Sequence, residues 1–579
     1  MKANYKYIIP AFVVVIVFIG MLSFRKAESQ FQKPILAFKS VLKNAAFCGL
    51  SFIEPYAETD IPAMKGWGHY SFKITTESDS AQFFFDQGLS YYYAFHAYEA
   101  YASFSKAAKI DTTNAMAWYG KALAMGPNIN YGNDYRGPSA AGEAALQSRL
   151  FQAGTSAVES ALIGAMQVRY TADTSISVFQ LRTRYAKAME QVYIDFPQNP
   201  DVITLYADAL LLLHPWDLYD HAMKPKVWTA QIRGLLEKAL LISPKHPGAN
   251  HYYIHVLEAS AHPELALESA ALLDTLMPSV AHITHMPSHI YIRTGNYSQG
   301  IIDNDLAVEG FNNSVKAFSP IAGGSGLYKD HNIHLKENCA HMAGNYRIAS
   351  EAANMVQASV NKADMHIKNS AGNFYQYLYM QPVLTDVRFG KWAQILASEK
   401  MDSLGYASVL LHFARGLAFC SMGNVISGKF ELKALEEKLG DNTLKYPMDN
   451  FSSAYETSLV ADLILKGMIA AEEGSYTASI DLLKQAVVAE DNIIYNEPRD
   501  WPLPARQYLG TVLIKAKKYP MAVKVLKSDL AINPNNGWAL TGLKTVYQQT
   551  SNNIELIKIN AKLRDAWKIK DLEINAPVF

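Results

Sequence analysis

The sequence of 579 residues contains few cysteines, and their arrangement excludes several kinds of site. Only Cys48, Cys339 and Cys420 are present, and no two of them form a CxxC pair. A disulfide framework and a cysteine-based structural zinc site are therefore excluded. The sequence also lacks a glycine-rich phosphate loop, a nucleophile elbow and an HExxH motif. It therefore carries no familiar signature of a nucleotide-binding protein, a serine hydrolase or a zinc peptidase.

An excess of charge of either sign is also missing. Lysine and arginine together number 53, aspartate and glutamate also number 53, and no block of basic residues stands out. Proteins that bind nucleic acid without sequence preference depend on basic side chains that neutralise phosphates. We therefore expect no nucleic-acid partner.

Helical periodicity continues through most of the chain, which is too long for a single compact core. Pro244 and Pro278 each follow a predicted helix and lie 34 residues apart, which is the period of tetratricopeptide helix pairs. A glycine or lysine marks the turn between paired helices at six later positions: Gly295, Gly344, Gly390, Gly423, Gly474 and Lys517. The sequence therefore predicts an all-α superhelix of the tetratricopeptide type, whose concave face is built by the first helix of each pair.

Five segments are predicted along the chain. They are a signal peptide or membrane anchor (1–29), a linker (30–77), N-terminal helical repeats with a long loop insertion (78–240), histidine-rich central repeats (241–365) and C-terminal repeats (366–579).

The N-terminal segment carries a targeting signal. Lys2 and Lys6 precede an apolar run over residues 7–24, at the lower limit of membrane-spanning length. Ala27 and Ser29 fit a cleavage site, but Arg25 next to the run is unusual for one. A retained anchor and a cleaved signal peptide both remain open. In either case we expect the large C-terminal part to be exported, which places the protein in the cell envelope or outside it.

Histidines are concentrated in the central repeats, where ten of the sixteen lie between His246 and His341. His251 and His255 recur as His285 and His289, displaced by 34 residues. Each pair has i, i+4 spacing and therefore lies on one face of a helix. Helix packing in this fold does not require histidine, so the repetition indicates a site.

The histidine pattern extends to a third helix. Aligning Gly295 with Gly344 places His282 on His331 and His285 on His334, and Glu258 shares the face of the first pair. Imidazoles on adjacent helices 8–10 Å apart can reach one ion, and imidazole suits zinc, copper, iron or nickel. The predicted metal ligands are His251, His255, His285, His289 and His334. A histidine-lined groove that binds a peptide or an anionic molecule without metal is the alternative.

Pro287 complicates the second pair, because proline inside a helix removes one hydrogen bond and clashes with the preceding turn. Either the helix kinks there, or it begins at Pro287 and leaves His282 and His285 in a loop. The geometry of the second pair depends on which of these holds.

Other residues of the same face and of a later polar connection are predicted to contact a ligand. In the connection over residues 496–507, the charged side chains form either a local salt-bridge network or part of a ligand site. The predicted ligand-binding residues are Tyr252, Glu258, Arg293, His331, Asn332, His341, Trp501 and Arg506.

Several stretches, among them AMAWYGKALAMGPNIN, LHPWDLYD, HPGANHYYIHVLEAS, HMPSHIYIRTGNY and NEPRDWPLPARQYLG, resemble a widespread group of bacterial tetratricopeptide repeat proteins over roughly residues 66–545. The resemblance implies an all-helical repeat fold and brings no established reaction. One departure is that Phe95-His96-Ala97 stands where the group tends to read Phe-Asn-His.

Three functions follow from these patterns. We favour a non-enzymatic scaffold in the cell envelope, whose concave histidine face binds a protein, peptide, small ligand or transition metal (zinc, copper or iron). The second is a metal-dependent enzyme that uses the same histidines, with Glu258 as general base or ligand. The third is a structural adaptor that docks partner proteins in an aromatic groove.

Overall fold

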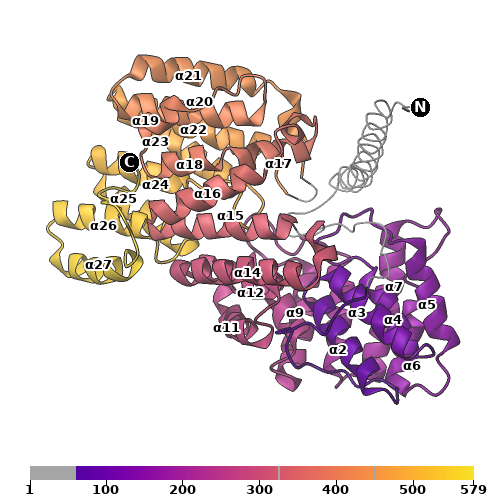
Figure 1. Cartoon of the computed structure of the whole chain (residues 1–579). Helices are drawn as coiled ribbons and strands as arrows, with labels where there is room; N and C mark the ends of the chain where they lie inside the picture. Colours follow the sequence, from indigo (N-terminus) through magenta and orange to yellow (C-terminus); the bar gives the residue numbers. More distant parts are fainter. Residues whose placement is uncertain (1–59, 324–325, 449–450) are drawn as a thin grey trace, which may run out of the picture.

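The computed structural model describes residues 60–323, 326–448 and 451–579, and these residues form helices joined by turns and loops. Within these ranges there is no β-strand, and backbone pairing outside helices is limited to isolated bridges such as Tyr219–Pro225. Consecutive helices pack as hairpins along the chain (Figure 1). The predicted all-α superhelix of helix pairs is confirmed.

The helices divide into two lobes with two long helices between them (Figure 1). The first lobe and the central region contain α2 (Asp79–Tyr93), α3 (Ala97–Ile110), α4 (Ala115–Ala124), α5 (Ser139–Leu150), α6 (Ala157–Met166), α7 (Val178–Asp195), α8 (Pro200–Leu211), α9 (Val227–Ile242), α10 (Pro247–Glu258), α11 (Leu267–Leu276), α12 (Ala281–His285), α13 (Pro287–Thr294), α14 (Tyr297–Ala317) and α15 (Gly326–Ala343).

The second lobe contains α16 (Tyr346–Ser359), α17 (Ser370–Tyr379), α18 (Gln381–Arg388), α19 (Trp392–Ala397), α20 (Tyr406–Ser421), α21 (Val425–Lys438), α22 (Ala454–Glu472), α23 (Tyr476–Asp491), α24 (Ala505–Lys515), α25 (Tyr519–Ile532), α26 (Gly537–Gln549) and α27 (Asn553–Ala566). The long helices between the lobes are α14 and α15.

The predicted turns adopt the left-handed backbone conformation that ends many helices. Gly295 has a φ of 81° and Gly344 a φ of 72°, and the φ angles of Gly390, Gly423 and Gly474 are also positive. Glycine reaches this conformation without a steric penalty. Lys517 reaches it as well, with a φ of 57°, so the predicted lysine turn has the same geometry.

The predicted linker lies only partly within the described residues, and its described end is packed rather than free. Residues 60–77 contain no helix, but Trp67 and Ile74 are buried. The backbone N–H of Ser279 donates to the carbonyl of Gly66 at 3.0 Å, and the Tyr70 hydroxyl donates to Asp201 at 2.7 Å. This segment therefore fastens α8 and the start of α12 to the N-terminal helices.

The C-terminal end of the repeat array returns to the central helices. The Tyr297 hydroxyl donates to the carbonyl of Pro534 at 2.6 Å, and Asn345 donates to the carbonyl of Ile569 at 2.6 Å. Trp538 is fully buried and donates from its indole to the carbonyl of His341. These contacts pack the C-terminal helices against the start of α14 and the end of α15.

In the described ranges, no helix is both long and apolar enough to cross a membrane. The predicted signal or anchor at 1–29 lies outside the described residues.

Candidate metal centre

The helical segment around Pro287 is divided by a one-residue break at Met286, and both pairs of histidines keep their i, i+4 spacing. One helix, α12, ends at His285, and the next, α13, begins at Pro287. Met286, between them, has helical dihedral angles (φ −54°, ψ −36°). His282 and His285 therefore lie in a short helix rather than a loop, and the second pair is a true copy of the first.

Three histidines from two helices converge in the first group. His251 and His255 come from α10, and His282 comes from α12. The Nε2 atom of His251 lies 3.0 Å from Nε2 of His255 and 3.1 Å from Nε2 of His282. One ligand atom from each ring lies within 4.8 Å of the others, as an ion bound by all three would require.

A second group repeats this arrangement one repeat later. His285 and His289 come from α12 and α13, and their Nε2 atoms lie 2.7 Å apart. His331 of α15 is the third member, with its ring centroid 4.6 Å from that of His285. In both groups an i, i+4 pair is therefore completed by one histidine from the following repeat.

In four of the rings, the Nδ1 atom forms a hydrogen bond with an oxygen acceptor outside the group of histidines. Nδ1 of His251 lies 2.6 Å from the carbonyl oxygen of Tyr93, and Nδ1 of His285 lies 2.7 Å from Oδ1 of Asn304. The Asn304 amide donates to the carbonyl of Gly300, which fixes its oxygen toward His285. A carbonyl oxygen can only accept, so these Nδ1 atoms carry the proton and the facing Nε2 atoms carry lone pairs.

Glu258 connects the two groups. Its two carboxylate oxygens accept from Nδ1 of His255 at 2.9 Å and from Nδ1 of His289 at 2.5 Å. Burial would raise the pKa of Glu258, but His289 and His255 lower it to about 2. Both oxygens are therefore occupied by imidazole N–H groups. This differs from the predicted use of Glu258 as a ligand or general base, because neither oxygen is left for that role.

The histidine rings are buried rather than lining an open groove. The exposed fraction of the six side chains is between 0 and 5 %. The Phe95 ring covers the first group, and its centroid lies 4.5 Å from that of His251 and 5.7 Å from that of His282. The Trp216 ring packs edge-on against His255, with the ring centroids 5.4 Å apart. Both Phe95 and Trp216 have positive φ. The expected open histidine groove is thus a closed centre, because turns remote in sequence cover it.

Burial has a consistent electrostatic effect on these rings. Burial and neighbouring imidazoles lower the pKa of His251, His282 and His331 well below the usual value. His289 differs, because Glu258 outweighs the effect of burial and raises its pKa. Most of the cluster therefore consists of neutral rings with an available nitrogen lone pair.

Two predicted histidines lie elsewhere on α15. The ring of His334 packs edge-on against Tyr377 at 5.5 Å, and its i+4 neighbour is Asn338, which donates to the carbonyl of His334. Nε2 of His341 lies 2.8 Å from the Thr385 hydroxyl. His334, predicted as a ligand, therefore joins neither group, and His282 and His331 occupy the third positions instead.

The predicted ligand-binding residues are distributed over several environments. Tyr252 is fully buried and stacks on Phe95, and Asn332 is also fully buried. Arg293 donates to the backbone carbonyls of Glu258 and Ser260, so it fixes the end of α10 rather than facing an open site. Trp501 and Arg506 line a cavity of about 410 Å³ between the turn at residues 220–223 and the segment over residues 490–506.

Sequence reasoning missed several side chains that build the centre. The spacing puts His282 on the right face but outside the predicted ligand set. Phe95 is notable in the sequence only as part of Phe95-His96-Ala97, and Asn304 is not part of any motif. The 49-residue step that relates His282 to His331 was the available signal for the third positions. Neither Phe95 nor Asn304 could be assigned to the centre from local spacing, because Phe95 contacts His251 from more than a hundred residues away in sequence and Asn304 contacts His285 from about twenty.

No protein-family model matches this sequence, and no curated protein matches it. Among solved structures it is similar to TPR-like helical repeat proteins. The human IFIT1 dimer with m7Gppp-AAAA is 13 % identical, with 85 % of this chain and 91 % of that chain covered and a TM-score of 0.29. Yeast Tom70 is 10 % identical, with coverage of 86 % and 93 % and a TM-score of 0.25. The Cut9–Hcn1 hetero-tetramer of APC/C is 12 % identical, with coverage of 86 % and 97 % and a TM-score of 0.25. Similarity at this level supports no conclusion about function or partners.

Proposed function

We propose that this helical-repeat protein holds two transition-metal ions, each in a centre of three histidines, and that Glu258 orients one ligand of each centre. The proposal rests on one observation. In the first group, Nε2 atoms that carry lone pairs face each other at 3.0 Å, and in the second group the Nε2 atoms of His285 and His289 lie 2.7 Å apart. Two lone pairs at this distance repel unless a cation lies between them.

The spacing of the nitrogens supports a metal ion. Tetrahedral zinc with Zn–N bonds of about 2.05 Å places two imidazole nitrogens roughly 3.3 Å apart. The 3.0 and 3.1 Å spacings around His251 are close to this value. A shared proton joins two nitrogens only, whereas three rings converge in each group. The oxygen acceptors on Nδ1 are also the second-shell partners that metal-bound histidines normally have.

Ligand chemistry restricts the metal. All-imidazole sets suit zinc, copper, iron and nickel, and they disfavour magnesium and calcium, which prefer oxygen. A centre with three protein ligands keeps a fourth position for water or substrate, as catalytic zinc sites do. This favours the metal-dependent enzyme as the second candidate function, with a base other than Glu258. Location in the cell envelope remains a proposal that depends on the segment at 1–29.

Metal titration of the purified chain tests the proposal. Protein stripped with chelator and titrated with zinc or copper against a chromophoric competitor should bind about two ions per chain. The double variant His251→Ala with His255→Ala should bind about one, and so should His285→Ala with His289→Ala. The control His262→Ala removes an exposed histidine that pairs with Glu264 and should still bind two.

Circular dichroism of each variant shows whether the helices are intact. A folded chain that binds no ion more tightly than the competitor, or pair variants that bind as many ions as the control, would overturn the proposal.

A further inference from the structure

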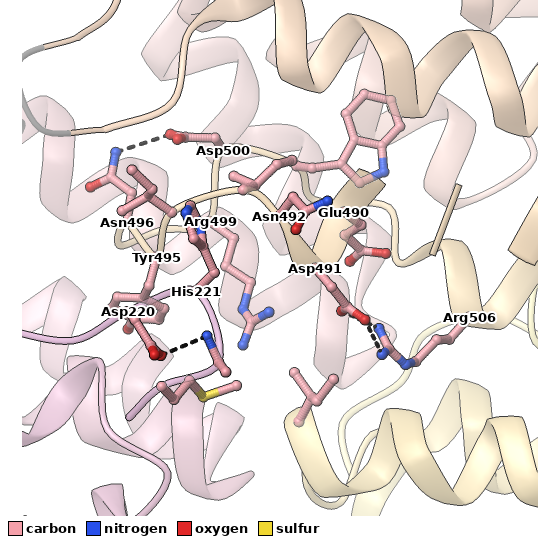
Figure 2. A pocket seen from close by; sticks show the side chains of 16 residues that line it. Asp220, His221, Glu490, Asp491, Asn492, Tyr495, Asn496, Arg499, Asp500 and Arg506 are labelled. Carbon is pink, nitrogen blue, oxygen red and sulfur yellow. Dashed lines mark hydrogen bonds and ion pairs between the residues drawn. The ribbon is translucent and has the colours of Figure 1, made fainter. Parts of the chain in front are cut away.

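A cavity near the histidine centre has an apolar wall and a charged wall (Figure 2). It lies between the turn at residues 220–223 and the connection that follows α23, and its volume is about 410 Å³. Ile493, Ile494 and Trp501 supply apolar surface, and Asp220, Arg499 and Arg506 supply charge. A cavity of this size and composition suits a small molecule with an apolar body and a few polar atoms.

Most of the charges in its lining are already satisfied by neighbours. Arg506 makes two hydrogen bonds to Asp491, at 2.8 and 2.7 Å, which Figure 2 shows at the edge of the cavity. Asp500 accepts from Asn496 at 2.9 Å, and Glu490 accepts from the backbone of Ala505 at 2.7 Å. Burial raises the pKa of both Asp500 and Glu490 to about 7, so neither is a full negative charge at neutral pH.

Arg499 is the exception. Its side chain extends into the space between the labelled residues of Figure 2. Its Nη2 atom is buried and has no hydrogen-bond partner among the described residues. A buried guanidinium N–H without an acceptor costs free energy that an anionic ligand would recover.

A second arginine strengthens the positive potential at this point. The guanidinium carbon of Arg293 lies 4.9 Å from the centre of the Tyr495 ring, and that of Arg499 lies 5.9 Å from the same centre. Nε of Arg293 is also buried without a partner among the described residues. Burial and Arg293 lower the pKa of Arg499. The buried Glu497 offsets only part of the repulsion between the two arginines, so a bound anion would offset more of it.

The acidic side chains at the rim limit the charge of the anion. Asp220 and Asp491 both line the cavity. They disfavour a dianion such as a phosphate monoester more strongly than a singly charged carboxylate. A carboxylate also matches the planar donors of a guanidinium group.

We propose that this cavity binds a small organic monocarboxylate, with the carboxylate on Arg499 and the apolar body against Trp501 and Ile493. The site stands on these contacts and does not depend on metal in the histidine centre. It does adjoin that centre, because Arg293 connects Met223 of the cavity lining to the end of α10, where Glu258 lies.

Calorimetry with phenylacetate and its neutral isostere phenylacetamide tests the proposal on the full chain. Phenylacetate should bind at least about tenfold more tightly than phenylacetamide, because only the acid can pair with Arg499. Arg499→Gln should lose this preference, and Arg499→Lys should retain part of it. Arg347→Gln, which removes an exposed arginine paired with Glu351, should bind like the original chain.

Each titration is run on metal-free and zinc-treated protein, so the result is independent of whether the histidines bind metal. Equal binding of acid and amide, no binding of phenylacetate at about 10 mM, or an unchanged preference in folded Arg499→Gln would overturn the proposal.

Discussion

At the scale of single residues, one carboxylate holds a ring of each histidine group. Glu258 is fully buried, and each of its oxygens accepts one imidazole N–H. A buried charge is retained only when its partners are well placed, and here they are two rings on different helices. Glu258 therefore links the positions of His255 and His289, although the two belong to different repeats.

Replacing Glu258 with glutamine should weaken both centres together. The amide oxygen can still accept from one imidazole, but the amide nitrogen cannot accept from the other. Loss of such a second-shell partner typically lowers metal affinity by about 10–100-fold. Competition titration with zinc measures the effect. Glu264→Gln, which alters the exposed pair with His262, is the control and should change neither affinity. Weakening of only one centre would contradict the proposed shared role of Glu258.

A second residue-scale prediction concerns pH. Burial raises the pKa of Glu337 to about 8, while Thr385 donates to one oxygen at 2.9 Å. Between about 4.5 and 8 the folded chain thus binds a proton that the unfolded chain does not, so this contribution to stability falls as pH rises through that window. Glu337→Gln is neutral throughout.

The variant should therefore lose less stability than the original chain between pH 6 and 9, by about 1–3 kcal/mol. Thermal unfolding across that range measures the difference. Glu351→Gln, at an exposed ion pair with Arg347, should follow the original chain. Parallel pH curves for the original chain and Glu337→Gln would show that Glu337 is ionised at pH 6.

At the scale of helices, the turn glycines serve two different purposes. Gly344 and Gly423 have similar positive φ values, 72° and 80°. A Cβ atom on Gly344 would lie 2.5 Å from the Trp567 ring, whereas one on Gly423 would meet nothing within 4 Å. Gly423 is therefore required by backbone conformation alone, and Gly344 also by close contact with the C-terminal segment.

Alanine substitutions separate these two requirements. Gly423→Ala should lower the free energy of unfolding by about 1 kcal/mol, which is the cost of the left-handed conformation. Gly344→Ala should cost about 2–4 kcal/mol, because Trp567 must move as well. Urea unfolding followed by circular dichroism measures both. Equal losses would mean that the contact with Trp567 contributes little.

These elements also show how far sequence reasoning reaches. Period and turn chemistry are local properties, and they predicted the helix pairs and all six turn positions correctly. Spacing within one helix also identified both i, i+4 pairs. It could not show which histidine of the next helix completes each group, because that depends on how helices cross. The repeat alignment predicts His334 as a metal ligand because it places His334 on His285. However, the residue four positions after His334 is Asn338, not histidine, so His334 lacks the second histidine of the pair.

At the scale of the whole molecule, the centre lies where the two lobes meet. His251 and His255 belong to the first lobe, while His331 belongs to α15, which runs between the lobes (Figure 1). The apolar cores of the two lobes are separate clusters on either side of this region. Ions in the proposed centres would therefore tie α10 to α12, and α12 and α13 to α15, with little effect on helices farther along the second lobe.

Hydrogen exchange measured by mass spectrometry should reveal this localisation. Metal at 100 times its dissociation constant stabilises the bound state by about 2.7 kcal/mol. Amides that exchange only when the centre opens should then exchange about 100-fold more slowly. We expect this protection in α10, α12, α13 and α15, which contain the six histidines, and none in α20 or α21, which contain none of them. A chain with both histidine pairs replaced by alanine should show no change on adding metal. Equal protection in α20 and α15 would mean that metal stabilises the whole chain or binds elsewhere. Metal bound only between α10, α12, α13 and α15 would not slow local opening of helices at the far end of the second lobe.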